Sequence, residues 1–388
     1  MIVRQFISWI RTAPAGERAE ATRALARAWL ISDLSADDRI AAEGALLMQL
    51  DDSSPLVRQA MADVFARSME APAAIVQALS LDQPPIALPI LEHSPLLIDA
   101  DLVDIVATGN SEVQCAIARR VSLPPSVSAA IAEVGSPAAA LELIENAHAE
   151  LAPFSWDRIV ERHGHLAAIR ESMLVLDGLP AATRLALVAK LSETLAQFVV
   201  ARNWLSPDRA GRVASEARER STVNIAAGSR GEDMQDLVRH LRATGQLTAG
   251  LILRALLSGN LALFDVALAE LSGLPQARVA ALLHDRGGAG VQALLTRAGL
   301  PESTFAAFRV ALEVGHETGY VDTPDGAARL RRRMVERVLT HCRTERQAAE
   351  PLLILLRRFA TESAREEARM FCEELLAEDA IERDLIAA

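Results

Sequence analysis

The chain has 388 residues, of which 51% are hydrophobic, 23% charged and only 4% aromatic. This balance excludes an intrinsically disordered chain, and the length predicts two or more modules in place of one core. The net charge is −11, and the single lysine, Lys190, together with the lack of a GxxxxGK[ST] motif, argues against P-loop and Schiff-base enzymes.

The negative charge is concentrated near the N-terminus. Residues 1–150 contain 10 arginines and 20 acidic residues, whereas residues 151–388 contain 30 basic and 31 acidic residues. An acidic surface repels phosphate backbones, so we expect no nucleic-acid partner there. A basic protein or peptide would suit it better, although a merely solubilising acidic face is an equally plain interpretation.

A short unit recurs through residues 1–150. Helices are predicted to begin at Pro55, Pro84, Ser111 and Pro137, with steps of 29, 27 and 26 residues between the surrounding segments, which are SPLVRQAMA (54–62), QPPIALPIL (83–91), NSEVQCAIA (110–118) and SPAAALELI (136–144). Such spacing allows two short helices and two turns per unit. It predicts an α-solenoid, in which each unit buries its apolar face against its neighbours.

Apolar periodicity places the helices of this region. The predicted helices are 17–31, 36–50, 54–69, 72–81, 84–92, 99–107, 110–121, 125–134 and 137–149. Core stripes are expected at Val57, Met61, Val64 and Phe65 and, in the third unit, at Val113, Ile117 and Val121. Pro89 lies inside its helix and should kink or shorten it. Residues 1–12 form an amphipathic segment expected to pack on the helix 17–31, with contact to a membrane surface as the alternative.

Three further sections are predicted after the N-terminal repeats. Residues 151–246 form a middle helical section in which AAGSRG (226–231) is a flexible connection. Residues 247–320 form a compact section, in which GLP at 273 and 299 closes one helix with glycine and opens the next with proline. Residues 321–388 form a helical hairpin or a three-helix section. The fold class is therefore all-α: a short HEAT-like solenoid followed by helical-bundle sections.

Two clusters resemble chemical sites but have plainer interpretations. His163 and His165 with Glu161 supply fewer ligands than a zinc site needs, so we predict no metal. The HDRGGAG loop (284–290) follows a helix where a dinucleotide fingerprint requires a strand. Its Gly287, Gly288 and Gly290 are expected to form a wide turn, with anion binding at the next helix N-terminus as the alternative.

An arginine run at 329–337 precedes an acidic helix, 362–384. Nucleic-acid binding would require interleaved aromatic residues, so we favour charge pairing between the two helices.

Cys115, Cys342 and Cys372 form no CxxC pair, which fits a reduced cytoplasm. We expect no signal peptide, because the first residues lack its apolar core, and no bilayer-spanning stretch, and we find no recognisable catalytic motif.

Two stretches resemble a known family. They are residues 86–109 with IARR (117–120), and GLPQARVAALLHDRGGAGVQALLTRAGLPESTFAAF (273–308). They are similar to an uncharacterised bacterial family, recorded as a domain of unknown function, over residues 35–320. The resemblance implies an all-helical fold with HEAT-like repeats near the N-terminus and implies no catalytic residues.

The sequence therefore favours a non-enzymatic, cytoplasmic interaction protein, a regulator or scaffold in bacterial signalling that binds a protein or peptide and needs no cofactor. Exposed side chains on the second helix of each unit should contact the partner, namely Arg58, Gln59, Gln114, Arg119 and Arg120. The alternative is a sensor of a small anion or nucleotide, with a pocket between the solenoid and residues 247–316.

Overall fold

The fold is all-α in a computed structural model that describes residues 2–284, 288–318, 324–344 and 350–387. Within these ranges there is no strand, only one isolated bridge between Leu123 and Ala149. The chain forms two compact units, unit 1 (residues 1–179) and unit 2 (residues 180–388). The first unit thus extends past residue 150, where the predicted first section ended. Residues 180–388 form one unit, although the sequence analysis divided them among three sections.

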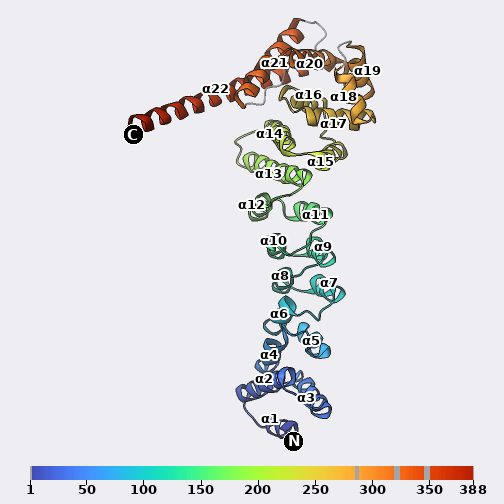
Figure 1. The fold of residues 1–388 in the computed structure, drawn as a ribbon, viewed down its shortest axis with the longest axis vertical. Helices are drawn as coiled ribbons and strands as arrows, with labels where there is room; N and C mark the ends of the chain where they lie inside the picture. Colours follow the sequence, from blue (N-terminus) through green and yellow to red (C-terminus); the bar gives the residue numbers. More distant parts are fainter. Residues whose placement is uncertain (1, 285–287, 319–323, 345–349, 388) are drawn as a thin grey trace. The chain divides into compact units, whose positions relative to one another are not determined.

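Unit 1 consists of short helices in two layers (Figure 1). In one layer α2, α4, α6, α8, α10 and α12 each pack against the next, and in the other α7, α9 and α11 do so. The helices are α1 (Ile2–Ile10), α2 (Ala15–Ile31), α3 (Ala36–Gln49), α4 (Pro55–Phe65), α5 (Ala73–Ser80), α6 (Pro84–His93), α7 (Asp99–Thr108), α8 (Ser111–Ala118), α9 (Pro125–Val134), α10 (Pro137–Glu145), α11 (Pro153–His163) and α12 (Ala167–Val175).

Helix starts in unit 1 follow the predicted proline and cap positions. Pro55, Pro84 and Pro137 each occupy the first helical turn, where the N–H that proline lacks would have no intrahelical partner. The Asn110 and Ser136 side chains cap α8 and α10 by accepting from backbone N–H groups three residues on. These local rules explain why most predicted boundaries fall within a few residues of the observed ones.

The core of unit 1 is built from the predicted stripe of α4. Val57, Met61 and Phe65 are fully buried, and Phe65 meets Trp29 edge to face with ring centroids 6.3 Å apart. Val64 of α4 and Val113 of α8 are half-buried, and in the third unit the prediction was wrong at Val121. Ile117 is fully buried, whereas Val121 is 73% exposed because α8 ends at Ala118, before the stripe reaches it.

Three other local predictions need correction. α6 continues through Pro89 to His93, so it is not shortened, while the kink stays a prediction. The connection predicted at 226–231 is much shorter, because α14 extends to Gly228 and the next helix begins at Gly231. The first helix packs chiefly against α3, not against the predicted helix 17–31.

Unit 2 contains longer helices around one apolar core. Phe264 and Phe308 are fully buried at its centre, with stacked rings 6.0 Å apart. Its helices are α13 (Ala181–Ala201), α14 (Pro207–Gly228), α15 (Gly231–Ala243), α16 (Ala249–Leu257), α17 (Leu261–Ser272), α18 (Gln276–His284), α19 (Ala289–Arg297), the 3-10 turn η1 (Glu302–Thr304), α20 (Phe305–Thr318), α21 (Pro324–Thr344) and α22 (Glu350–Ala387).

The glycine-leucine-proline entries have the predicted geometry. Gly273 and Gly299 have φ of 68° and 72°, in the left-handed region that favours glycine. Gly273 follows α17 directly, and its N–H donates to Ala269 O. Glycine therefore closes the preceding helix, as the sequence indicates.

Over the described ranges the C-terminal section contains two long helices, α21 and α22, and not three. The last two predicted helices are one continuous helix, α22, which packs against α21. Arg332 of α21 lies 2.5 Å from Glu367 of α22, so the predicted charge pairing is confirmed at this position. Over the described ranges no single helix is long and apolar enough to cross a membrane; α17 and α18 reach that length only when counted together across a sharp bend.

Candidate functional site

Two of the five predicted contact residues, Arg58 and Arg119, form ion pairs within unit 1. Arg119 is exposed and pairs with Glu142 of α10. Arg58 is half-buried; its Nε lies 2.6 Å from a carboxylate oxygen of Asp82, and its Nη1 donates to the backbone oxygen of Asp52 at 2.5 Å. Both guanidinium groups therefore join successive helix pairs of the stack.

Gln114 was predicted to be exposed, and that prediction is wrong. α8 packs against both α6 and α10, so residues 114–118 are all buried. The apolar pattern of α8 therefore does not show which of its side chains are exposed. The Gln114 amide donates to Val106 O at 3.0 Å and accepts from Ser136 N at 2.8 Å. Gln59 is half-buried on α4.

Arg120 was also predicted to be exposed and is only 8% exposed. Its Nη1 donates to Leu91 O at 2.6 Å and its Nη2 to Ser94 O at 2.7 Å, at the C-terminal end of α6. The last carbonyls of a helix lack intrahelical donors, and a cation there interacts favourably with the helix dipole. Arg120 therefore joins the end of α8 to the end of α6 and does not present a binding surface.

The sequence analysis missed two residues that repeat this arrangement. Arg162 donates to Ala132 O at 2.8 Å and to Gly135 O at 2.9 Å, at the end of α9. The Asn146 amide donates to Ala118 O and Arg120 O, at the end of α8. Each donor lies 26–30 residues after its acceptor. That spacing, close to the sequence repeat, is the signal that could have found them.

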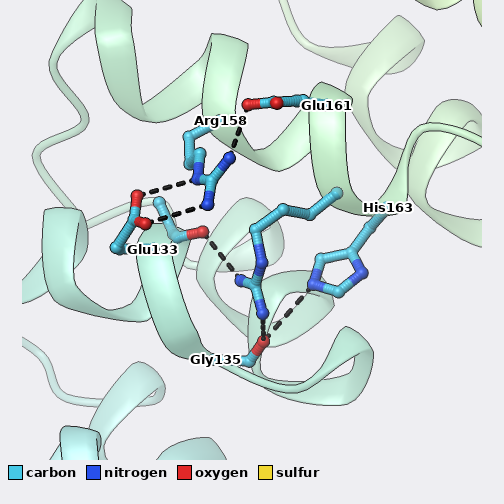
Figure 2. A network of polar contacts seen from close by, with 7 residues as sticks. Glu133, Gly135, Arg158, Glu161 and His163 are labelled. Atoms are coloured by element: carbon cyan, nitrogen blue, oxygen red, sulfur yellow. Dashed lines mark hydrogen bonds and ion pairs between the residues drawn. The ribbon is translucent and has the colours of Figure 1, made fainter.

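The cluster around His163 is a network of arginine contacts (Figure 2). Arg158 of α11 lies 2.7 Å from Glu133 of α9 and 2.6 Å from Glu161. His163 is 7% exposed, with Nε2 3.3 Å from Gly135 O. No group of three metal-ligating side chains occurs among the described residues. The network joins α11 to α9.

Unit 1 is expected to lose stability as the pH falls from about 7 to about 5, partly through His163. Burial lowers the pKa of His163 below 6.5, and the Arg162 and His165 charges act in the same direction. The unfolded chain therefore binds the proton first, so stability is lost as the pH falls from 6.5 toward the lower folded-state pKa. Below pH 6.5 the urea midpoint of His163→Gln should depend less on pH than the urea midpoint of the wild type. The exposed control His165→Gln should follow the wild type, and equal slopes for all three proteins would contradict this role.

The predicted glycine loop is described only in part. Gly287 lies outside the described residues. Gly288 has φ of 69° and immediately precedes α19, and Gly290 lies in the first turn of that helix. A positive-φ glycine is thus confirmed at Gly288, whereas the preceding part of the predicted turn lies outside the described residues. Anion binding at this helix end stays a prediction.

One known protein family matches most of the chain. Residues 86–347 match a family described as an uncharacterised protein conserved in bacteria (DUF2336). The chain belongs to this family. The DUF2336 match begins in α6 and ends just past α21, so the predicted extent of 35–320 was wrong at both ends. HEAT-like repeats stay a prediction. No curated protein and no solved structure matches the chain.

Proposed function

We propose that this chain is a non-catalytic binding protein in which unit 1 receives a basic segment of a partner protein. A regulatory or scaffolding role in bacterial signalling, in the cytoplasm, is the setting we infer for it. The observation that carries the proposal is electrostatic. Unit 1 contains 13 arginines and 24 acidic residues, whereas unit 2 contains 27 basic and 27 acidic residues, so unit 1 holds the whole net charge.

The contacts that the arginines of unit 1 make support this proposal. Ten of the 13 contact another group of unit 1 through an ion pair, a hydrogen bond or an aromatic ring. Seven acidic side chains pair with them. The remaining carboxylates greatly outnumber the remaining arginines, so the outer surface is strongly negative and attracts cationic partners.

The architecture of unit 1 suits an extended ligand. Its helices pack against their neighbours along the chain, as α4 does between α2 and α6, so the surface grows with each added pair. Exposed carboxylates occur along this length, at Glu70 before α5, Asp104 on α7 and Asp157 on α11. A basic segment could therefore contact several of them in turn.

The test is binding of a fluorescent arginine-rich peptide to the full chain at about 0.15 M salt, followed by anisotropy. The triple variant Glu70→Gln, Asp104→Asn, Asp157→Asn should bind about tenfold more weakly, since exposed charge pairs contribute about 0.5 kcal/mol each. Raising the salt concentration should weaken binding of the wild type more than of the variant.

The matched control neutralises three exposed carboxylates of unit 2, in Glu193→Gln, Asp208→Asn and Glu302→Gln. It changes the net charge equally, and its affinity should stay within about twofold of the wild type. Equal weakening by both triple variants would show that only net charge matters and would reject a binding surface on unit 1.

A further inference from the structure

Unit 2 contains a cavity of about 890 Å³ in which arginine is the most frequent lining residue. Its walls come from α14, α16, α17, α21 and α22 and from the turn before α15. Six guanidinium groups and two carboxylates line it, from Arg220, Arg230, Arg254, Arg331, Arg365, Arg369, Glu362 and Glu366. These charged side chains alone give the cavity a charge of +4, in a chain whose net charge is −11.

One wall of the cavity is a buried ion pair. Arg254 is 6% exposed; its Nη1 lies 2.6 Å from Glu362, and its guanidinium carbon lies 4.2 Å from the centre of the Phe359 ring. Glu362 also lies 3.1 Å from Arg220. One carboxylate thus serves two arginines.

Arg331 lines the same cavity without an anionic partner among the described residues. Its Nε is inaccessible to solvent and has no hydrogen-bond partner. Burial lowers the pKa of Arg331, and the nearby Arg254 charge lowers it further, against the opposing effect of Glu366 and Glu362. The buried Nε–H of Arg331 has no acceptor, which is costly, and a bound anion would supply one.

The start of α17 also lines the cavity. Asn260, Leu261 and Ala262 line it, and they form the cap and first turn of a 12-residue helix. The Asn260 side chain accepts from Leu263 N and donates to Val223 O, which fixes the position of this helix end. Asn260 N and Leu261 N donate to Ala255 O and Gly259 O, so this helix end contributes chiefly its partial positive charge, which complements the arginines.

We propose that this cavity binds a small molecule that carries two or more phosphate groups. Its volume lies in the range of small-ligand sites. Planar guanidinium groups bind phosphate oxygens in pairs, and the arginines come from several helices and so surround a compact ligand. A second arginine-rich hollow lined by Arg209, Arg212, Arg357 and Arg358 joins it through Arg220 and Arg365 and would attract such an anion. This proposal does not depend on peptide binding by unit 1.

Isothermal titration of the full chain with inorganic triphosphate, ATP, orthophosphate and sulfate tests the proposal. We expect saturable binding of triphosphate and ATP and much weaker binding of orthophosphate and sulfate. Similar affinities for triphosphate and ATP would assign recognition to the phosphate groups, and tighter ATP binding would assign it to a nucleotide. No binding of either at millimolar concentration would overturn the proposal, as would equal binding of sulfate.

Some variants are expected to weaken triphosphate binding and one to strengthen it, which makes the test specific. Arg331→Gln with Arg365→Gln should weaken triphosphate binding at least about tenfold, since each loses a charge-assisted contact. The control Arg333→Gln with Arg343→Gln changes two exposed arginines of α21 outside the cavity and should stay within about twofold. Glu362→Gln should strengthen binding several-fold, because Glu362 competes with the ligand for Arg254 and Arg220. Equal weakening by both double variants, or weaker binding by a folded Glu362→Gln protein, would overturn the proposal.

Discussion

Replacing Arg120 by methionine is expected to lower the free energy of unfolding of unit 1 by about 2–4 kcal/mol. Methionine keeps much of the buried volume but cannot donate to Leu91 O and Ser94 O. The carbonyls at the end of α6 then lose their partners in a buried setting. Burial lowers the pKa of Arg120, so the guanidinium pays a desolvation cost that keeps the effect below the sum of its hydrogen bonds.

The neighbouring residue provides the control. Arg119→Met removes an exposed ion pair with Glu142 and should cost less than about 1 kcal/mol. Urea unfolding with amide exchange, read separately for each unit, measures both variants. Protection should fall in α6 and α8 for Arg120→Met alone. Equal loss in the two variants would contradict the buried role of Arg120.

The second large effect is expected from Phe308→Ala, at about 3–5 kcal/mol in unit 2. Phe308 is fully buried and stacks on Phe264, so truncation leaves a cavity in the centre of the core. Phe308→Leu should cost much less, because it retains most of the side-chain volume. Phe371→Ala, at a 54% exposed position of α22, should change stability within about 0.5 kcal/mol. Chemical unfolding gives all three values, and a small loss in Phe308→Ala would reject this core.

The helices of unit 1 were predictable because their ends are specified locally. First-turn prolines such as Pro55 and Pro137 mark where helices begin, whatever packs around them. Gly273 and Gly299 likewise mark helix ends through their positive φ. The alternating helix layers follow from the repeat length, although the HEAT-like class stays a prediction.

The exposure of single polar residues was not predictable from the same pattern. Periodicity assumes one buried face, but α8 is covered on opposite sides by α6 and α10, so Gln114 is buried although it is polar. Arg120 follows the helix end, where the helical period no longer applies. Both burials depend on neighbours 22 to 29 residues away.

The arginine cavity of unit 2 was hidden from local motifs for a related reason. Its ion pair joins Arg254 and Glu362, 108 residues apart, so no short pattern contains both. Within the run at 329–337, Arg332 pairs with Glu367 as predicted, whereas Arg331, one position earlier, lines the cavity. Adjacent residues of a helix point about 100° apart, so one run serves two purposes.

The most direct test of the account titrates the full chain with the arginine-rich peptide and with triphosphate, in the wild type and in two variants. Neutralising Glu70, Asp104 and Asp157 should weaken peptide binding only. Replacing Arg331 and Arg365 by glutamine should weaken triphosphate binding only. Separate losses would establish an acidic binding surface on unit 1 and a cationic cavity in unit 2. Loss of both ligands in both variants, or of neither, would contradict the account.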